Sequence, residues 1–458
     1  MNAQEAEQYL TTLNNMPRQK YPRTSKRGAV YLKRLHYFLD LLGNPEKRIP
    51  HYVHVTGTSG KGSVATFMAS VLSTSGKKTG LMISPHPTHM RERWQVSGTI
   101  MTEREFIKII ETLRPVLDTY SRTSPYDMVS YLDIITAIGL FYFAKKKVTW
   151  AVLEAGCGGR YDSTNIIPHK DVAIITSVGL DHMHLLGNTK EKIAYEKIGI
   201  VTSACHVFTM ERNPKVLKVI KKECQKKNII PHLSPLSLAP TVRSYGSTGV
   251  DFSYENHEYH LPIMGDHQIK NAAMVIDIAH QLGINDQTIR HGLATAVQAL
   301  RLEVAGYAPI VIFDGAHNPD KMKTTVRAIQ LLSRSPEFFA KTKKRSRLHL
   351  IIGFANDKKV SPMIKRLAKL LPTTVACTRN TVNPFRKVAA PTALVRSCTE
   401  LLPHASIAGF LDPEDALTWS LKQCGPRDIL LVTGSIFLSG QVKALFQAKI
   451  LDNRHIFD

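Results

Sequence analysis

Residues 54–67, HVTGTSGKGSVATF, have the residue types of a phosphate-binding loop but an unusual spacing. The common pattern places lysine directly before serine or threonine, whereas Gly62 here separates Lys61 from Ser63. Lys61 can neutralise phosphate charge, and the Ser63 hydroxyl can bind Mg²⁺. The alternative is a glycine turn with a chance lysine. An apolar strand precedes the loop and a helix follows it, which favours a nucleotide site formed by Gly57, Thr58, Ser59, Gly60, Lys61, Gly62 and Ser63.

An acidic residue and a histidine follow two further apolar runs. Glu154 ends the run TWAVLE, and Asp181-His182 follow VAIITSVGL. The carboxyl ends of parallel strands are where α/β folds bind ligands, so Glu154 can hold Mg²⁺ directly or through water. A lone glutamate is as often a cap or a solvated residue, and a lone histidine is usually structural. Their shared position beside a phosphate loop favours metal or phosphate contact.

Three other candidates are ambiguous on pattern alone. Lys197 lies in AYEKIGI, a helical pattern in which a lysine is normally solvated. Asp314 and His317 follow the strand in IVIFDGAHNP, where His317 can contact a carboxylate or phosphate. A turn held by Asp and Asn explains that stretch equally well. Ser435 follows the apolar run ILLV in another strand–turn–helix context.

The elements that must position these residues alternate between apolar strands and helical patterns. This alternation predicts α/β architecture with a mostly parallel sheet. In the first half the expected strands are Tyr52–Thr56, Thr79–Ser84, Thr149–Glu154 and Val172–Ser177. The helix after the loop has one apolar face, formed by Val64, Phe67, Met68, Val71 and Leu72. Capping-box patterns begin two further helices, at Thr102 with Glu105 and at Asn188 with Glu191.

The second half contains a change of pattern and then a second α/β series. Residues 228–262 are rich in Pro, Ser and Tyr and predict a small β-excursion, including a strand at Val250–Tyr254, before a helix from about His267 to Leu282. The later expected strands are Ile310–Phe313, Leu348–Gly353, Thr374–Cys377 and Ile429–Val432. We therefore predict a P-loop domain at residues 1–300 and a smaller, Rossmann-like α/β domain at 301–458, with the basic stretch 341–347 as a surface loop.

Composition fits a globular protein of two or three domains. The chain has 458 residues, of which 43% are hydrophobic, and its N-terminus lacks the apolar region of a secretory signal. The apolar run Tyr131–Ala144 is too short to cross a bilayer. Six scattered cysteines without a CxxC pair argue against structural zinc and disulfides, and they fit the cytoplasm. The net charge of +23 can attract anions, although a solvated basic surface is the simpler explanation.

Taken in order, the motifs resemble those of the Mur ligase superfamily, and within it the folylpolyglutamate synthase/dihydrofolate synthase family. HVTGTSGKGS resembles the family loop HVxGTNGKGS, in which the glycine after the lysine is normal. The matching segments, which span residues from about 31 to 440, include SPH (84–86) with RER (91–93), LEAGCGGRYDSTN, SVGLDHMHLLGNTKEKIAYEKIGI, GDHQIKNAA, DGAHNP, GFANDKK and TGS.

The resemblance implies an ATP-dependent amide ligase that activates a carboxylate as an acyl phosphate and joins it to glutamate. Lys61, Glu154, His182 and Lys197 would be the catalytic set. Two Mg²⁺ sites are implied, one held by Ser63 and Glu154 and the other by His182 and by Lys197 carboxylated by CO₂. Asn271, Arg301 and Asp314 would contact ATP, and Asp314 with His317 also matches the glutamate side of the C-terminal domain. Substrate contacts are implied for Ser84, His86, Arg93, His317 and Ser435.

This chain departs from the family pattern at a few positions. Ala299-Leu300-Arg301 stands where the family has a Pro-Gly-Arg turn, which leaves the geometry of the junction open. Ser59, Cys157 and Asp133 replace a usual Asn, Leu and Glu.

The expected partners are small molecules: a reduced folate or dihydropteroate, L-glutamate and ATP. A cytoplasmic monomer that binds neither membrane nor nucleic acid is expected. One alternative is a Mur-type ligase acting on another carboxylate. A second is a basic, nucleotide-dependent nucleic-acid-binding protein, which predicts strongly salt-dependent binding. A third is a non-catalytic relative, against which the intact set of catalytic residues argues.

Overall fold

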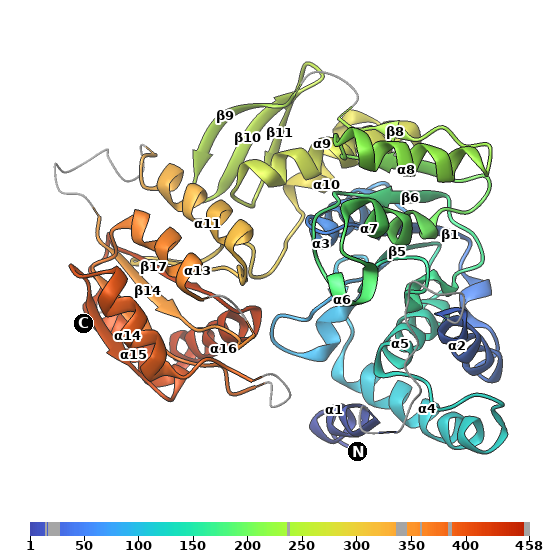
Figure 1. The fold of residues 1–458 in the computed structure, drawn as a ribbon, viewed down its shortest axis with the longest axis horizontal. Coiled ribbons are helices and arrows are strands. Elements are labelled where there is room, and N and C mark those ends of the chain that lie inside the picture. The colour runs from blue at the N-terminus through green and yellow to red at the C-terminus, as the bar shows by residue number, and fades with distance from the viewer. Residues whose placement is uncertain are drawn as a thin grey trace. The chain divides into compact units, whose positions relative to one another are not determined.

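The computed structural model describes residues 1–13, 16, 28–235, 239–335, 346–357, 360–382 and 387–452. The chain forms two compact units. The N-terminal unit comprises Met1–Pro240, Tyr254–His257 and Lys270–Ala296, and the C-terminal unit comprises Thr241–Ser253, Glu258–Ile269 and Val297–Asp458. Both are α/β units with mostly parallel sheets (Figure 1), so the predicted fold class is confirmed. The predicted boundary near residue 300 stays a prediction.

The N-terminal unit is built on an eight-stranded sheet in the order β4-β3-β2-β5-β1-β6-β7-β8. Its strands are β1 (His51–Thr56), β2 (Thr79–Met82), β3 (Trp94–Val96), β4 (Thr99–Ile100), β5 (Trp150–Glu154), β6 (Val172–Ile175), β7 (His206–Thr209) and β8 (His232–Leu233). The pairs β2–β3 and β3–β4 are antiparallel, and the other pairs are parallel. The four strands predicted here are confirmed, each within two residues at its ends.

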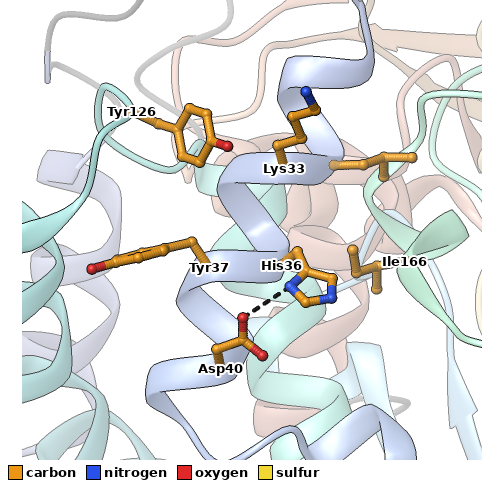
Figure 2. Close-up of a pocket in the computed structure, with 7 residues that line it drawn as sticks. Lys33, His36, Tyr37, Asp40, Tyr126 and Ile166 are labelled. Carbon is orange, nitrogen blue, oxygen red and sulfur yellow. Dashed lines mark hydrogen bonds and ion pairs between the residues drawn. The ribbon is translucent and has the colours of Figure 1, made fainter.

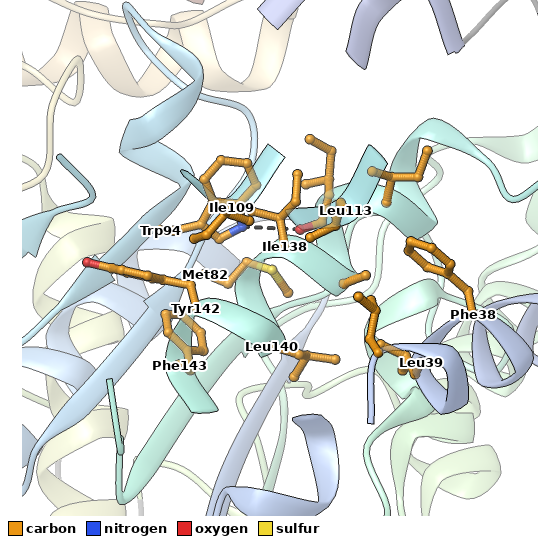
Figure 3. Close-up of a cluster of buried hydrophobic side chains, with 14 of the residues drawn as sticks. Phe38, Leu39, Met82, Trp94, Ile109, Leu113, Ile138, Leu140, Tyr142 and Phe143 are labelled. Carbon is orange, nitrogen blue, oxygen red and sulfur yellow. Dashed lines mark hydrogen bonds between the residues drawn. The ribbon is translucent and has the colours of Figure 1, made fainter. Parts of the chain in front are cut away.

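A large apolar cluster covers part of this sheet. It joins residues of α1 (Ala3–Thr12), α2 (Ala29–Leu41), α4 (Glu103–Thr123) and α5 (Tyr131–Lys145) to the strands. Figure 3 shows Trp94 among Met82, Ile109 and Ile138, with its indole N–H donating to the Ile135 carbonyl at 3.2 Å. Gly139 permits this approach, since a Cβ there would lie 2.8 Å from the indole Cδ1. None of the helices in the described part of the chain is long and apolar enough to span a membrane.

The remaining helices of this unit confirm one predicted cap and correct another. They are α3 (Lys61–Thr74), α6 (Met183–Leu186), α7 (Lys190–Lys197), α8 (Pro214–Gln225), α9 (Asp266–Gln281), which crosses between the units, and α10 (Asp286–Ala294). The capping box of Thr102 and Glu105 is present at the start of α4. The predicted cap at Asn188 is wrong by one residue, because the Thr189 hydroxyl accepts the N–H of Lys192 and starts α7.

The C-terminal unit has a six-stranded sheet in the order β12-β13-β17-β14-β15-β16, parallel except for β12–β13. The strands are β12 (Glu303–Tyr307), β13 (Ile310–Phe313), β14 (Leu348–Ile352), β15 (Thr374–Cys377), β16 (Ser406–Gly409) and β17 (Ile429–Thr433). The helices are α11 (Pro319–Leu332), α13 (Val360–Leu367), α14 (Pro391–Leu401), α15 (Pro413–Gln423) and α16 (Ile436–Asp452). The four strands predicted here are confirmed.

Side chains of this sheet alternate between two cores. Ile310 and Ile312 pack into one cluster with α11, α13 and α14, whereas Val311 and Phe313 pack into the other with α15 and α16. Both faces of the sheet are therefore covered, as a parallel sheet requires.

The predicted β-excursion contains a separate three-stranded antiparallel sheet of β9 (Thr241–Gly246), β10 (Gly249–Tyr254) and β11 (His257–Leu261). The predicted surface loop at 341–347 lies outside the described residues, apart from its last two.

Candidate active site

The glycine-rich loop between β1 and α3 has a backbone that only glycine fits well. Gly57 and Gly60 have φ values of +152° and +85°. A Cβ on Gly57 would lie 1.8 Å from Thr176 Oγ1, and one on Gly60 would lie 2.7 Å from Asn271 Oδ1. The strand–loop–helix context predicted for a phosphate loop is therefore present, and Asn271 of α9 lies against it.

The loop is held from the neighbouring strand β6. Thr176 Oγ1 donates to the Ser59 carbonyl at 2.6 Å, and the Thr58 N–H donates to the Ser177 carbonyl at 2.7 Å. The Gly179 N–H donates to the Thr58 hydroxyl at 2.8 Å. Sequence analysis missed Thr176, because only the β1–β6 register, in which Thr56 pairs with Ile175, brings the end of β6 to the loop.

Two lysines meet at one carbonyl of this loop. Lys61 Nζ donates to the Gly57 oxygen at 3.1 Å, and Lys197 Nζ donates to the same oxygen at 2.7 Å. Lys197 is only 3% exposed, so the solvated interpretation of this residue is wrong. Burial, and then the nearby charge of Lys61, lower the pKa of Lys197 to about 7. At neutral pH, much of this amine is therefore uncharged.

Glu154 ends β5 and is buried. Its Oε2 accepts the backbone N–H of Ser84 at 2.8 Å, which ties the segment after β2 to the carboxyl end of β5. Nearby, Arg93 of the 3₁₀ turn η4 (Met90–Arg93) donates from Nε to His86 Nδ1 at 3.1 Å. Ser84 and His86 follow β2, and Arg93 directly precedes β3, so the antiparallel β2–β3 pairing brings the two motifs together in this unit.

His182 lies at the start of α6 with a left-handed backbone, φ +48°. Its side chain is about half exposed, with Nε2 3.7 Å from the Asp181 carboxylate. Partial burial lowers its pKa despite the opposing effect of Asp181, so a neutral imidazole predominates at pH 7. A neutral imidazole can coordinate a metal.

A magnesium site is compatible with the chemistry of these donors. Ser63, a hydroxyl, and Glu154, a carboxylate, are buried at one end of the sheet, and both are hard oxygen ligands. Among the residues that the structure describes, no three His, Cys, Asp or Glu side chains are grouped to hold a metal. Of the expected magnesium ligands, only Glu154 and His182 are His, Cys, Asp or Glu residues. The magnesium sites would therefore also depend on the Ser63 hydroxyl and on a carboxylated Lys197.

The C-terminal unit contains the other predicted site residues. A Cβ on Gly315 would lie 2.9 Å from the Arg301 guanidinium. Burial, and then the charge of Arg301, lower the pKa of His267 to about 4. His317 Nδ1 lies 2.8 Å from the Gly315 carbonyl, and its Nε2 lies 3.3 Å from Lys321 Nζ.

Asp314 organises the turn that carries these residues. Its Oδ1 accepts the Ala316 N–H at 3.1 Å and the Thr325 hydroxyl at 2.6 Å, and its Oδ2 accepts the Leu302 N–H at 3.3 Å. This pattern agrees with the turn interpretation of DGAHNP. Ser435, which is buried, follows β17 at the carboxyl end of the same sheet.

A separate pocket of about 410 Å³ lies beside α2. Figure 2 shows Tyr37 and Tyr126 with the His36–Asp40 pair, whose Nδ1 and Oδ2 atoms are 3.0 Å apart. None of the predicted site residues lines this pocket.

Comparison with known families gives two matches along the chain. Residues 55–279 match the Mur ligase middle domain, and residues 300–436 match the Mur ligase glutamate ligase domain.

Individual relatives extend over most of the chain. It is 31% identical to the dihydrofolate synthase/folylpolyglutamate synthase of Bacillus subtilis over 430 residues, which are 90% of this chain and 94% of that protein. The structure of folylpolyglutamate synthase from Thermotoga maritima superimposes with a TM-score of 0.81 at 28% identity, covering 98% of both chains. An FPGS–AMPPCP complex superimposes with a TM-score of 0.77 at 26% identity, covering 98% of this chain and all of that chain.

Proposed function

Because the chain belongs to the folylpolyglutamate synthase/dihydrofolate synthase family of Mur ligases, we propose that it joins L-glutamate to the carboxylate of a reduced folate or dihydropteroate. It is an ATP-dependent ligase. The observation that carries the proposal is the phosphate loop, whose Gly57 carbonyl accepts from Lys61 and from the buried Lys197.

The proposed reaction has two steps. A carboxylate oxygen of the acceptor attacks the γ-phosphorus of ATP, an O–P bond forms, and ADP leaves. The neutral amine of glutamate then attacks the acyl carbon, a C–N bond forms, phosphate leaves, and the amine loses a proton. The protein contributes mainly by placing the reactants and by compensating negative charge.

We assign the nucleotide to the loop of residues 57–63 and to Asn271, and from the family resemblance we also assign nucleotide contacts to Arg301 and Asp314. Lys61 Nζ donates to the Gly57 carbonyl oxygen in this structure. When ATP binds, Lys61 would break this hydrogen bond and donate to the phosphates. Because the loop is rich in glycine, the backbone N–H groups at the start of α3 can point toward a bound phosphate. Ser84, His86 and Arg93 belong to the acceptor side, and His317 and Ser435 to the glutamate side.

Two Mg²⁺ ions would be held by Ser63 with Glu154 and by His182 with carboxylated Lys197. When bound, they would supply positive charge that neutralises the phosphates of ATP during transfer. Carboxylation requires an uncharged amine, which attacks CO₂ to form a C–N bond and releases one proton. Lys197 is suited to this step because burial and Lys61 lower its pKa to about 7.

We further propose that the protein acts in the cytoplasm as a monomer. All six cysteines are free thiols, which agrees with a reducing compartment. Light scattering of the purified protein would test the monomer.

ADP formation by the purified protein with Mg-ATP and L-glutamate tests the function, comparing dihydropteroate, tetrahydrofolate and no acceptor. If ADP forms only with dihydropteroate, the protein is a dihydrofolate synthase, and if ADP forms only with tetrahydrofolate, it is a polyglutamate synthase. ADP formation with both acceptors identifies a bifunctional enzyme. A protein that binds ATP but responds to neither acceptor would overturn the proposal and favour a Mur-type ligase with another carboxylate substrate.

A further inference from the structure

Three adjacent strands of the N-terminal sheet end at the same level. β1, β6 and β7 are neighbours, and their last residues, Thr56, Ile175 and Thr209, form one row across the sheet. The segments that follow these strands therefore lie along one edge of the sheet, where the phosphate loop begins. A side chain from the segment after β7 can act on the phosphate loop through the segment after β6.

Glu211, two residues after β7, holds the segment after β6. Its Oε2 accepts the backbone N–H of Val178 at 3.0 Å, and its Oε1 accepts the N–H groups of Arg212 and Asn213 at 2.8 Å. The N–H of Glu211 donates to the Thr209 hydroxyl at 3.1 Å, which fixes the turn that carries the side chain. Because every partner of the carboxyl group is a donor, both oxygens must accept. A carboxylate suits this position and an amide does not.

The residues on either side of Val178 contact the phosphate loop. The Gly179 N–H donates to the Thr58 hydroxyl at 2.8 Å, and the Thr58 N–H donates to the Ser177 carbonyl at 2.7 Å. Val178 itself is buried in the apolar cluster of this side of the sheet. One buried residue therefore separates the carboxylate of Glu211 from two residues that bind Thr58.

We propose that Glu211 is a positioning residue for nucleotide binding. By accepting the Val178 N–H, it keeps Ser177 and Gly179 against Thr58 and so holds the phosphate loop in the conformation that receives the phosphates. This inference rests on the proposed assignment of the nucleotide to residues 57–63. Glu211 belongs to none of the motifs that identified the loop in the sequence, and it acts on the loop through the segment after β6.

The link can be measured without turnover, by amide hydrogen exchange of the full-length protein followed by NMR. Glu211→Ala removes the acceptor of the Val178 N–H, so this amide should exchange faster. The deciding amide is Gly179, which donates to Thr58 and not to Glu211. Its exchange should also become at least about tenfold faster if the two hydrogen bonds are linked. Faster exchange of Val178 with unchanged exchange of Gly179 would overturn the inference.

Nucleotide affinity tests the consequence for binding. For a non-hydrolysable ATP analogue with Mg²⁺, Glu211→Ala should raise Kd about tenfold, with KM for the acceptor and for glutamate within about twofold. Glu211→Gln keeps one accepting oxygen and should raise Kd only about threefold. An unchanged Kd in Glu211→Ala, or an equal rise in all three constants, would contradict a positioning role at the phosphate loop.

Asn213→Ala is the matched control for damage to α8. The Asn213 side chain accepts the N–H groups of Lys215 and Val216 at the start of this helix and is not among the partners of the Val178 N–H. Its loss should lower stability and leave Kd for the nucleotide analogue within about twofold. A rise in Kd equal to that of Glu211→Ala would show general damage and overturn the inference.

A double mutant tests whether Glu211 acts through Thr58. Thr58→Val removes the hydroxyl that accepts the Gly179 N–H, so in this background Glu211→Ala should raise Kd less than about twofold further. A full tenfold effect in both backgrounds would contradict the coupling.

If Glu211→Ala does not fold, Glu211→Gln decides, and wild-type values of both Gly179 exchange and Kd in that variant would overturn the inference. A wild-type protein that binds no nucleotide would overturn the proposed function instead. The exchange of Gly179 would still report whether Glu211 holds the segment beside Thr58.

Discussion

Lys197 shows how one residue can be misjudged from sequence and understood from its surroundings. A lysine on a short helix with no strong apolar face is normally solvated, yet this one is buried against the phosphate loop. The pattern could not reveal this, because the Gly57 carbonyl that binds it is 140 residues away in the sequence. Only the resemblance to a known family pointed to the role that we propose for it.

Lys197→Ala should abolish ligation, with kcat reduced more than about 100-fold, and leave ATP affinity within about threefold. The reason is that it removes a proposed metal ligand and leaves the phosphate loop intact. Isothermal titration and ADP formation would measure both effects, and short carboxylic acids should partly restore activity. Lys61→Ala is the contrasting variant, since it should weaken ATP binding itself. Wild-type turnover by Lys197→Ala would disprove the assignment.

Gly57→Ala should lower ATP affinity more than about tenfold, because its Cβ would collide with Thr176 Oγ1 and displace the loop. Gly76→Ala is the matched control, since Gly76 also has positive φ, +82°, but open space around it. It should cost only the strain of the left-handed backbone, about 1 kcal/mol, and leave ATP affinity unchanged. Adding Thr176→Ala to Gly57→Ala should recover part of the affinity. Normal ATP binding by Gly57→Ala alone would contradict the steric account.

At the scale of elements, eight buried strands were predictable, whereas the buried parallel strand β7 was missed together with the short or edge strands β3, β4, β8, β12 and β16. The eight predicted strands of the two large sheets are continuous apolar runs between helical patterns. Such runs are typical of strands that are buried on both faces of a sheet. The antiparallel strands β3 and β4 have three and two residues, too few to show a period. The N-terminal helices α1 and α2 were also missed.

At Ala299-Leu300-Arg301, where the family has a Pro-Gly-Arg turn, packing and hydrogen bonds hold the backbone in place. Leu300 and Leu302 have φ values of +55° and +54°, which glycine would adopt more easily. Both side chains are buried, the Leu300 N–H donates to Glu303 Oε2 at 2.9 Å, and the Leu300 carbonyl accepts the Gly315 N–H at 2.9 Å. Burial and hydrogen bonding thus hold a strained backbone that the sequence pattern alone left open.

The amino ends of three parallel strands in the C-terminal unit meet at Asp428. Its carboxylate accepts hydrogen bonds from the backbone N–H, Nε and Nη2 of Arg347 and from the backbone N–H of Gly425. One carboxylate oxygen also lies 3.3 Å from His349 Nε2. Burial acts to raise the pKa of Asp428, but these hydrogen bonds outweigh it and hold the pKa below its usual value.

The stabilisation from Asp428 is therefore present above the unfolded-state pKa, about 4, and is lost as pH falls through the lower folded value. Asp428→Asn should weaken these hydrogen bonds to a charged group, destabilise this unit by about 2 kcal/mol at pH 7 and flatten its acid dependence. Urea unfolding followed by hydrogen exchange of residues 346–357 would measure this. Asp415→Asn, on the exposed side of α15, is the control. An acid dependence unchanged in Asp428→Asn would contradict the account.

For the whole molecule, the net charge of +23 predicts an effect of salt on anionic substrates. Lysines such as Lys215, Lys218 and Lys222 are exposed along α8, so much of the excess lies on the surface and acts at long range. When the salt concentration rises from about 20 to about 200 mM, kcat/KM should fall for both acceptors. The fall should be roughly threefold larger for a folate with three glutamates than for a folate with one glutamate. Stopped-flow or initial-rate assays would show this. Equal salt dependence for the two acceptors would contradict a steering role for the charge.

The most direct test of the central claim follows an oxygen atom. The acceptor that supports ADP formation would be labelled with ¹⁸O in its carboxylate, and the phosphate released during ligation to glutamate would be analysed by mass spectrometry. Activation as an acyl phosphate predicts one ¹⁸O in each phosphate, with the other retained in the new amide. Phosphate free of ¹⁸O, formed together with the amide product, would contradict the mechanism.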